Sequence, residues 1–430
     1  MKSIFKKIVV LIIQWEAVFV LKKYKPKIVA VTGSVGKTST KDAIFTVMSA
    51  KFFVRKSEKS FNSEIGVPLT ILGCSNAWNN PILWVKNIIE GFMLIVLKNH
   101  YPKWLVLEVG ADRPGDIESI AKWLKPDVVV LTALPDVPVH IEYFDSLEEI
   151  IKEKEYLLGA LKEDGILILN NDDEKVRAFK QKYKRTTVTF GFNDGATFKA
   201  SHDISDINLK QVSFRIDSNG SSVPVFIHKT LGRQHIYPAI AAFSVGSSQG
   251  LDMASMAEAY ENHEIPSGRM KIIDGINKST IIDDSYNSSP AAVKEALVTL
   301  RDIKASDINS GRKFAVLGDM MELGTYSVGE HKKVGDLVAE SADKLITVGI
   351  RARDISQSAE ENGMEKRNIF HFEDSIKAGK ELAQMLESGD IALIKGSQSV
   401  RMERIVKEVM ANPEDAEKLL VRQDKEWLSR

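Results

Sequence analysis

Short apolar, mostly β-branched runs recur along the chain and alternate with longer stretches of helical periodicity. The first run, Lys27 to Thr32, is followed by a glycine-rich turn and by residues that favour a helix. The runs from Trp104 to Val109, from Asp127 to Thr132 and from Gly165 to Leu169 have the same character. A continuous apolar run bounded by turn residues is typical of a buried parallel strand. These runs therefore predict a parallel sheet covered by helices.

The pattern changes between Thr186 and His228, where short alternating runs are separated by turns at Asn193-Asp194-Gly195 and at Asn219-Gly220. Alternation with close turns predicts a small antiparallel section attached to the parallel sheet. Between the last two parallel runs, the charged stretch from Glu142 to Leu161 predicts one long helix.

A second alternating unit follows Ile265-Pro266-Ser267-Gly268-Arg269, which has the composition of a hinge. Its strand and helix signals alternate, so we predict a second, Rossmann-like α/β domain. The strands expected there are Ser279 to Asp283, Lys313 to Leu317, Lys344 to Val348 and Ile391 to Ile394. The predicted division of the chain is an N-terminal helix over 1–26, a central domain over 27–262 and a C-terminal domain over 263–430.

The N-terminal segment is apolar but does not have the length of a membrane span. Two lysines precede the apolar run from Ile8 to Ile13, and polar residues interrupt the stretch that follows. A bilayer takes about 20 residues to cross, and no small-residue cleavage site of a secretory signal is present. Two interpretations stay open: a helix packed on the body of the protein, or an amphipathic helix over 1–21 on the inner membrane surface. The apolar stretch from Trp78 to Lys98 predicts a buried or partly exposed helix, with a membrane or partner contact as the alternative.

Composition narrows the class of protein. A chain of 430 residues predicts two or three domains. The 58 basic residues equal the 58 acidic ones, so net charge gives no reason to expect a nucleic-acid partner. One cysteine, Cys74, excludes an intramolecular disulfide and a cysteine-based metal site. A reducing, cytoplasmic setting fits this composition.

The turn after Lys27 to Thr32 has the character of a phosphate-binding loop. Its residues are Gly33, Ser34, Val35, Gly36, Lys37, Thr38 and Ser39. Glycines let backbone N–H groups approach phosphate oxygens, and the following helix adds its positive dipole end. Lys37 would reach the β- and γ-phosphates of ATP, and Thr38 would bind Mg²⁺. Val31 stands where the usual pattern has its first glycine, and the alternative is an ordinary strand-to-helix turn.

Acidic and amide side chains end the predicted strands beside this loop. Glu108 closes the run from Trp104, where α/β folds place a Mg²⁺ ligand or a water-orienting acid. The alternative is a buried carboxylate that caps a helix. Asp172 follows the predicted strand from Gly165 to Leu169. It either helps to hold a nucleotide or belongs to a plain turn.

Ten stretches from Lys27 to Glu403, in order, are similar to the motifs of the Mur ligase family. They are TGSVGKTSTK, FNSEIGVPLT, LEVGADRPGDI, the loop of His140, KEKEYLL, LNNDD, IPSGRM, IIDDSYNSSP, VLGDMMELG and LIKGSQSVRME. The chain most resembles the members that add D-alanyl-D-alanine to a UDP-muramoyl tripeptide. The resemblance implies an ATP-dependent, ADP-forming ligase that makes an amide bond through an acyl phosphate in peptidoglycan synthesis. A different acceptor, lipid-linked or of polyglutamate type, and a non-catalytic nucleotide-binding scaffold stay open as alternatives.

The resemblance also implies roles for single residues. Lys37 would act on the phosphates, and two Mg²⁺ ions would be held by Thr38, Glu108, His140 and Lys154. Lys154 corresponds to the lysine that the family carbamylates, although Lys152 beside it is an equally good candidate for a solvated helix lysine. For His140 the alternative is a loop histidine bonded to backbone.

The resemblance further assigns binding positions. ATP would contact the phosphate loop and Arg269, Asp283, Tyr286 and Asn287, and the substrates would contact Asn62, Lys395 and Arg401. For Lys395 and Arg401 the alternative is a surface charge. The implied partners are a small-molecule or lipid-linked cell-wall precursor and a dipeptide or amino acid, with no nucleic acid and with a monomeric chain.

Three departures from the family pattern are visible. The N-terminal domain with which the family grips the UDP group has no counterpart before Lys27. Ala133 replaces an asparagine, and Gln234 and Pro238 stand where the family has histidine and asparagine, with His235 one place later. We expect the last two departures to affect the surroundings of the metal site rather than the site itself.

Overall fold

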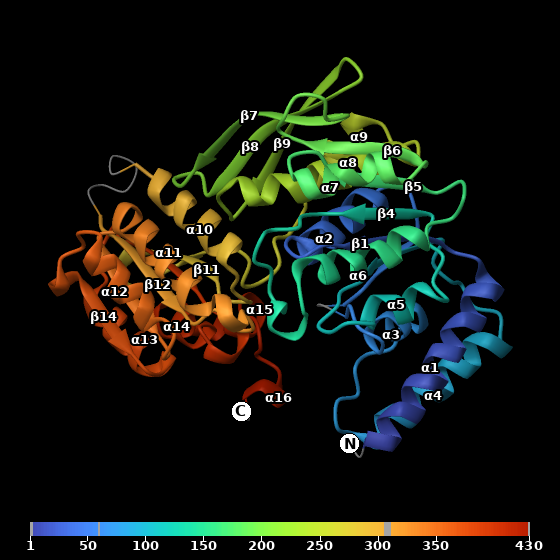
Figure 1. The fold of residues 1–430 in the computed structure, drawn as a ribbon, viewed down its shortest axis with the longest axis horizontal. Helices are drawn as coiled ribbons and strands as arrows, with labels where there is room; N and C mark the ends of the chain where they lie inside the picture. The colour runs from blue at the N-terminus through green and yellow to red at the C-terminus, as the bar shows by residue number, and fades with distance from the viewer. Residues whose placement is uncertain (1–2, 59–60, 305–310, 429–430) are drawn as a thin grey trace.

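Two sheets organise the chain, one in each half of the molecule (Figure 1). The computed structural model describes residues 3–58, 61–304 and 311–428. In that part of the chain the first sheet has nine strands in the order β2-β3-β1-β4-β5-β6-β7-β8-β9, and the second has six in the order β10-β11-β15-β12-β13-β14. The predicted pair of α/β domains is confirmed.

The first sheet is parallel from β2 to β7 and antiparallel from β7 to β9. Its strands are β1 (Lys27–Thr32), β2 (Val54–Lys56), β3 (Trp104–Glu108), β4 (Val128–Leu131), β5 (Ile166–Asn170), β6 (Thr186–Gly191), β7 (Phe198–Asp206), β8 (Gln211–Ser218) and β9 (Ser221–His228). The expected antiparallel section is therefore confirmed for β7 to β9, but β6 pairs in parallel with β5. A helix, α7 (Glu174–Lys182), lies between them, and a helical crossover returns the chain in the same direction.

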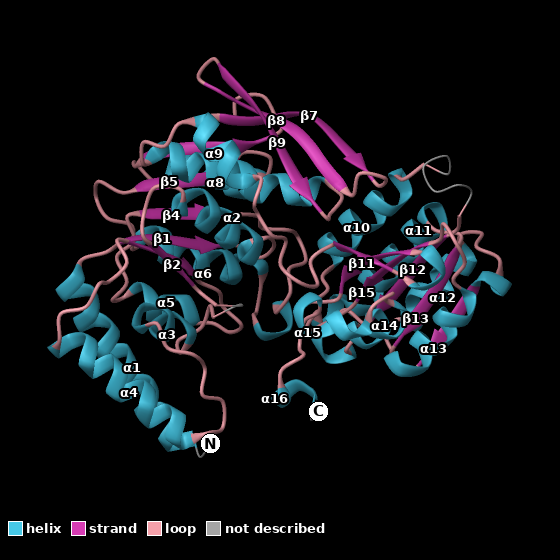
Figure 2. Ribbon diagram, turned by 180° about the vertical axis from the view of Figure 1, so that it is seen from behind, coloured by secondary structure: helices cyan, strands magenta, loops and turns pink. Residues whose placement is uncertain are grey.

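Helices cover both faces of this sheet, as Figure 2 shows from the other side. They are α1 (Ser3–Tyr24), α2 (Lys37–Ser49), α3 (Gly66–Leu72), α4 (Pro81–Val96), α5 (Asp116–Ala121), α6 (Leu147–Gly159), α7, α8 (Ile236–Ser248) and α9 (Met253–Tyr260). Successive residues of β1 point to opposite faces, so Ile28 and Ala30 join one buried cluster while Val29 and Val31 join the other. This double burial explains why the parallel strands read as continuous apolar runs.

The second sheet is parallel except for its edge strand β10, which is antiparallel to β11. Its strands are β10 (Lys271–Asp274), β11 (Thr280–Asp284), β12 (Lys313–Gly318), β13 (Lys344–Val348), β14 (Ile369–Phe372) and β15 (Ile391–Lys395). Its helices are α10 (Pro290–Asp302), α11 (Ser327–Ser341), α12 (Arg353–Glu361), α13 (Ser375–Met385), α14 (Glu403–Val409), α15 (Ala416–Leu419) and α16 (Lys425–Leu428).

The long helix predicted from Glu142 to Leu161 is wrong at its start. A short 3₁₀ turn covers Ile141–Tyr143, and α6 begins only at Leu147. Ser146 has extended backbone angles, and its hydroxyl accepts a hydrogen bond from the Glu149 N–H. A serine N-cap of this kind starts a new helix, which separates the loop of His140 from α6.

One side of the N-terminal helix packs on the body of the protein, as the first interpretation predicts. Ile13, Ala17 and Val20 of α1 are fully buried, and α1 lies beside α4 at the edge of the central domain in both views (Figures 1 and 2). Within residues 3–58, 61–304 and 311–428, no helix combines the length and the apolar character needed to cross a membrane.

Candidate active site

The predicted phosphate loop connects the end of β1 to the start of α2. Gly33 and Gly36 have φ angles of 137° and 83°, which favour glycine. A Cβ on Gly33 would also lie 2.1 Å from Oγ1 of Thr132. The Ser34 N–H donates to the carbonyl of Ala133 at 2.8 Å, which ties the loop to the segment after β4.

The half-buried Lys37 side chain folds back over this loop. Its Nζ donates to the carbonyl of Gly33 at 2.9 Å and to that of Ser34 at 3.3 Å. Removal of the ammonium group from water lowers the pKa of Lys37, and the nearby carboxylate of Glu108 opposes that shift. The loop therefore presents a cation and a helix N-terminus to the same space, as a phosphate site requires.

A central cavity of about 650 Å³ lies where this loop faces the C-terminal domain. From the central domain it is lined by Ser34, Val35, Gly36, Lys37, Thr38, Asn62, Glu108, Asp112, Val139 and His140. From the C-terminal domain it is lined by Arg269, Tyr286, Asn287, Ser288, Ser289, Ala292, Met321, Glu322, Ser397, Gln398, Ser399 and Trp427. The structure thus brings together residues that are far apart in the sequence.

Glu108 is buried at the end of β3, with 1% of the residue exposed. Its Oε1 accepts a hydrogen bond from the Asn62 amide at 3.3 Å, and its Oε2 has no hydrogen-bond partner among the described residues. A buried carboxylate oxygen without a partner is costly unless a cation occupies the site. The acid and the Thr38 hydroxyl line the same cavity and are the hard oxygen ligands that Mg²⁺ prefers, so these residues fit that ion.

His140 lines the same cavity, and its backbone lies in the left-handed region with a φ of 69°. Its Nδ1 is 2.6 Å from Oε2 of Glu322, and its Nε2 is 3.4 Å from Oδ1 of Asp112. Glu322 follows β12, so this contact joins the two domains. The hydrogen bond from His140 lowers the pKa of Glu322. The alternative interpretation of His140 is a loop histidine whose ring bonds to the backbone. Instead, both ring nitrogens of His140 lie near carboxylates.

Lys154 and Lys152 are clearly distinguished by the structure. Lys152 is exposed on α6, whereas only 3% of Lys154 is exposed. Burial, with repulsion from Lys37 as the next cause, lowers the pKa of Lys154 to about 7. Glu153 turns to α5 and accepts hydrogen bonds from the N–H groups of Gly115 at 2.6 Å and of Ile117 at 2.9 Å. Lys154 is therefore buried rather than solvated, but it does not line the central cavity.

A second cavity of about 350 Å³ lies on the other side of the loop, between the domains. Its lining includes Ser39, Asn170, Asp172, Tyr237, Glu295 and Lys395. Asp172 accepts hydrogen bonds from the Phe192 N–H at 2.6 Å and from the Tyr237 hydroxyl at 3.0 Å. Asp172 therefore both holds a turn and borders this cavity. The departures Ala133, Gln234, His235 and Pro238 line the same cavity, so they change its wall and not the group around Glu108.

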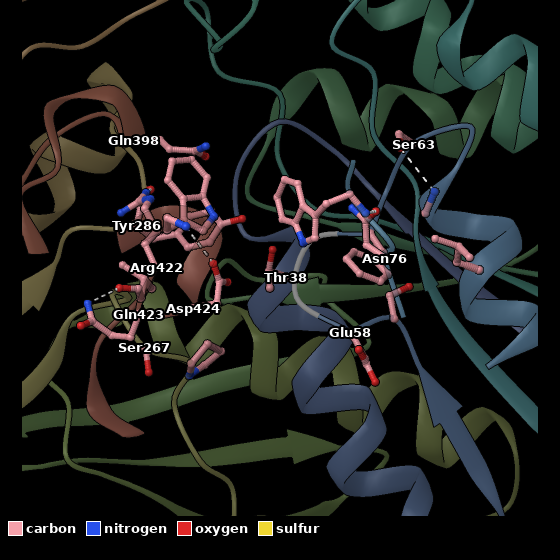
Figure 3. A pocket seen from close by; sticks show the side chains of 18 of the residues that line it. Thr38, Glu58, Ser63, Asn76, Ser267, Tyr286, Gln398, Arg422, Gln423 and Asp424 are labelled. Atoms are coloured by element: carbon pink, nitrogen blue, oxygen red, sulfur yellow. Dashed lines mark hydrogen bonds between the residues drawn. The ribbon is translucent and has the colours of Figure 1, made fainter. Parts of the chain in front are cut away.

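A third cavity of about 840 Å³ opens beside Thr38 (Figure 3). Glu58, Ser63 and Asn76 face it from the central domain. The C-terminal domain contributes Ser267, Tyr286, Gln398, Arg422, Gln423 and Asp424. Arg422 is fixed by the carboxylate of Glu403 at 2.9 Å and by the carbonyl of Ser285 at 3.1 Å. Nothing in the sequence marked Arg422, Gln423 and Asp424, because they follow the last recognisable motif, which ends at Glu403.

The predicted C-terminal site residues separate into two groups. Tyr286 and Asn287 line the central cavity, and Arg269 borders all three cavities with its guanidinium 4.1 Å from the ring centre of Tyr286. Lys395 is buried, its Nζ 2.5 Å from Oδ2 of Asp284. The alternative interpretation of Lys395 as a charge on the surface is therefore wrong, because its side chain is buried.

Asp283 and Arg401 line none of these three cavities, so the cavities give their predicted contacts with ATP and substrate no support. Asp283 is buried, its Oδ1 accepts from the Ser285 N–H at 3.1 Å, and burial raises its pKa to about 6. Arg401 pairs with Glu403 at 2.5 Å and donates to the Trp427 carbonyl at 3.1 Å. Both side chains are committed to the packing of the C-terminal domain.

The described residues hold no group of three or more His, Cys, Asp and Glu side chains arranged to bind a metal by themselves. Magnesium in nucleotide sites characteristically takes one or two protein ligands and completes its shell with phosphate and water. The few possible metal ligands around Glu108 therefore fit a magnesium ion that arrives with a nucleotide better than a permanently bound ion.

Comparison with known proteins agrees with this geometry. The family model "Mur ligase middle domain" matches residues 89–246, and "Mur ligase, glutamate ligase domain" matches residues 268–398. The UDP-N-acetylmuramoyl-tripeptide--D-alanyl-D-alanine ligase of Bacillus subtilis is 28% identical over 397 residues, covering 91% of this chain and 78% of that protein. The Escherichia coli enzyme of the same name is 26% identical over 403 residues, covering 92% of this chain and 79% of the other.

The solved structures with a similar fold include MurF ligases. The one from Thermotoga maritima in complex with ADP is 25% identical, with a TM-score of 0.74 over 95% of this chain and 84% of that one. MurF from Acinetobacter baumannii has a TM-score of 0.76 at 22% identity, covering 93% of this chain and 80% of the other, and shows the fold alone. The two domain matches, the order of the motifs and this architecture agree: the chain belongs to the Mur ligase family.

Proposed function

We propose that this protein is an ATP-dependent, ADP-forming ligase that joins a carboxylate to an amine through an acyl phosphate. The specific reaction that we propose is the addition of D-alanyl-D-alanine to a UDP-muramoyl peptide in peptidoglycan precursor synthesis. This is the reaction that the names of its relatives describe. One observation carries the proposal. The central cavity joins a phosphate loop, the buried carboxylate Glu108 with an unpartnered oxygen, and His140 between two domains.

Control of negative charge is the main demand of this reaction, because a carboxylate oxygen must attack the γ-phosphate. Lys37 and the loop N–H groups would hold the phosphates, and Thr38, Glu108, His140 and Lys154 would hold two Mg²⁺ ions. When bound, these ions supply positive charge to the reacting oxygens. The amine then displaces phosphate and leaves the amide bond.

Contacts between the domains would keep water from the acyl phosphate. Glu322 reaches His140 from the C-terminal domain, and Arg269 borders the central cavity from the hinge. Such closure protects a reactive intermediate from hydrolysis. Asn62 lines the same cavity and is our candidate for contact with the acceptor.

Carbamylation of Lys154 is the finer part of the proposal. A pKa near 7 leaves a substantial fraction of the amine neutral at physiological pH. The neutral amine can attack carbon dioxide, forming an N–C bond and releasing a proton. The product is an anion, which would replace repulsion toward Lys37 with attraction and would help to hold a metal ion.

Binding of ATP is proposed to span the central and second cavities. The loop from Gly33 to Ser39 would hold the phosphates, while Tyr286 and Asn287 approach them from the C-terminal domain. Asp172 and Lys395 border the second cavity, where the nucleoside would lie.

The acceptor and the setting stay open to test. A lipid-linked or polyglutamate-type carboxylate would use the same chemistry, and a scaffold without activity would have no use for the residues around Glu108. We propose a monomeric protein of the cytoplasm that acts on small-molecule or lipid-linked precursors. Membrane contact through residues 1–21 is a further prediction.

Phosphate release from ATP tests the proposal. UDP-muramoyl tripeptide and D-alanyl-D-alanine are supplied with Mg²⁺ to wild type, to Lys37→Ala and to the exposed control Lys152→Ala. We expect release that needs both substrates, disappears in Lys37→Ala and persists in Lys152→Ala. ATP binding without release would contradict this acceptor, and equal release by Lys37→Ala would contradict the assigned site.

A further inference from the structure

An apolar surface on α1 and α4 has no partner among the described residues. Twelve of the 21 exposed large hydrophobic side chains in the described part of the chain lie on these two helices or at the end of α4. They are Ile8, Leu11, Trp15, Phe19, Ile82, Leu83, Val85, Ile89, Phe92, Met93, Val96 and Leu97, with exposed fractions from 38% to 77%. We call this set the α1/α4 face. Concentration on one surface, rather than exposure of single residues, indicates a binding function.

Helical periodicity arranges the face into two stripes. On α1 the stripe consists of the exposed positions 8, 11, 15, 19 and 22, with Lys23 exposed beside its end, and the core side is formed by Ile13, Ala17 and Val20. On α4 the exposed stripe includes Ile82, Ile89 and Phe92, opposite the buried side. The spacing of three and four residues places each stripe along one side of its helix. The stripes are not an accident of fraying, since both helices are packed on their other sides.

The two helices run in the same direction and are fastened where they end. Lys23 Nζ donates to the carbonyls of Leu94 and Ile95, both at 2.9 Å, and the Tyr24 hydroxyl donates to Leu94 at 3.0 Å and to Leu97 at 3.1 Å. These bonds satisfy carbonyls at the C-terminal end of α4 that a helix leaves without partners. A surface whose backbone is satisfied in this way can enter a less polar medium at lower cost.

Charge around the face is strongly basic in a chain whose net charge is zero. From Ile8 to Lys25 and from Pro81 to Lys98 the exposed charged side chains are five lysines, Lys22, Lys23, Lys25, Lys86 and Lys98, and one glutamate, Glu90. Lys86 lies 3.6 Å from Glu90. Lys22 continues the stripe of α1, and Lys98 follows the stripe of α4. A second copy of the chain would bring the same lysines together, so charge disfavours self-association through this face. An anionic surface is complementary to it.

We propose that the α1/α4 face docks on a lipid bilayer that contains anionic headgroups. Its aliphatic and aromatic side chains would enter the interfacial region while the lysines contact phosphate groups, without a helix crossing the membrane. None of the three cavities described above is lined by the exposed members of the face. Hydrocarbon chains require no groove, so they suit this surface better than a peptide segment does.

Docking would also fix one wall of the third cavity relative to the bilayer. The segment between α3 and α4 contributes Asn76, Trp78 and Asn79 to that cavity, and α4 begins directly after it. The proposal does not depend on ligase activity, and the helices lie away from the C-terminal domain (Figure 1). Membrane binding can therefore be measured separately from catalysis.

Vesicle flotation of the full chain tests the proposal. The probes are phosphatidylcholine vesicles with and without phosphatidylglycerol, at low and high salt. We expect binding to the anionic vesicles that weakens with salt, and at least about tenfold weaker binding for the double variant Ile89→Ser/Phe92→Ser. The matched control Val328→Ser/Ile350→Ser removes exposed apolar side chains of the C-terminal domain and should bind like wild type.

Other outcomes decide against the proposal. Absence of binding to both vesicles, or equal binding by the stripe variant with its thermal unfolding unchanged, would overturn it. Light scattering that shows a dimer, dissociated by the stripe substitutions, would assign the face to a second copy. Lys37→Ala should bind vesicles like wild type even when phosphate release is lost, so failure of the proposed catalysis would not be mistaken for failure of docking.

Discussion

The central cavity and the α1/α4 face break the usual rule of burial in opposite ways. The cavity region buries the charged groups Glu108 and Lys154, whereas the face exposes Trp15, Ile89 and Phe92. Buried charges need compensation, and clustered apolar side chains need cover. In our proposals, phosphate and metal ions complete the first region, and a lipid surface covers the second. The comparison teaches that binding sites can be located by what the fold leaves unsatisfied.

The largest expected effect concerns the buried charges. Glu108→Gln keeps the shape and the hydrogen-bonding capacity toward Asn62 but removes the charge, and we expect phosphate release to fall by about 10²- to 10³-fold. The measurement is turnover at saturating ATP across a Mg²⁺ titration. Activity within about twofold of wild type at every Mg²⁺ concentration would contradict a metal-binding role.

The second largest effect is expected at Lys154, the other buried charged group. Lys154→Arg preserves a cation but cannot form the carbamate, so we expect a loss of about 10²-fold or more, with no loss in Lys152→Arg. Labelled bicarbonate followed by carbon NMR should give a carbamate signal in wild type and none in Lys154→Arg. Equal activities of both variants would exclude the modification as a requirement.

A smaller effect is expected where the two domains meet. Glu322 contacts the ring of His140, so we expect it to position that ring. Glu322→Gln should lower kcat by about tenfold with little change in the KM for ATP, because the second cavity is unchanged. The same steady-state assay on Glu142→Gln, in the neighbouring turn, is the control. A change confined to KM would argue against a positioning role.

The smallest effect concerns the stability of the apolar region. Glu16 of α1 is buried against Gly91 of α4, and its Oε2 has no hydrogen-bond partner among the described residues. Burial raises the pKa of Glu16 from 4.5 to about 7. The folded state therefore binds the proton more tightly than the unfolded state, and stability falls as pH rises from about 4.5 to about 7.

Urea unfolding at pH 5 and pH 8 measures this dependence. Relative to wild type, Glu16→Gln should be more stable at pH 8 and similar at pH 5, because glutamine mimics the neutral acid. Glu90→Gln, an exposed substitution on α4, is the matched control and should shift neither value. A pH dependence that is the same in wild type and Glu16→Gln would show that Glu16 is not the titrating group.

Much of the fold could be predicted because local patterns coincide with tertiary burial. The strands β1, β3, β4 and β5 are buried on both sides, so their composition alone marks them. The phosphate loop was predictable for a similar reason, since its residues are consecutive and need particular backbone angles. The break before α6 was not, because it depends on the single hydroxyl of Ser146.

The site was less predictable where it depends on contacts between domains. Glu322 has no distinguishing signal beyond its place in a short motif, and its contact with His140 exists only because two domains meet. Asp283 and Arg401 lie in recognisable motifs, yet packing directs both side chains away from the three cavities. The apolar composition from Trp78 to Lys98 predicted a helix there, but which side of α4 stays uncovered depends on the position of α1.

Transfer of oxygen tests the central claim most directly. The acceptor UDP-muramoyl tripeptide, labelled with ¹⁸O in its reacting carboxylate, is incubated with the protein, ATP, Mg²⁺ and D-alanyl-D-alanine, and the released phosphate is analysed by mass spectrometry. An acyl phosphate formed in the central cavity predicts one ¹⁸O atom in each phosphate, together with the new amide. Release of phosphate without the label would show that water attacks ATP and would contradict the ligase mechanism.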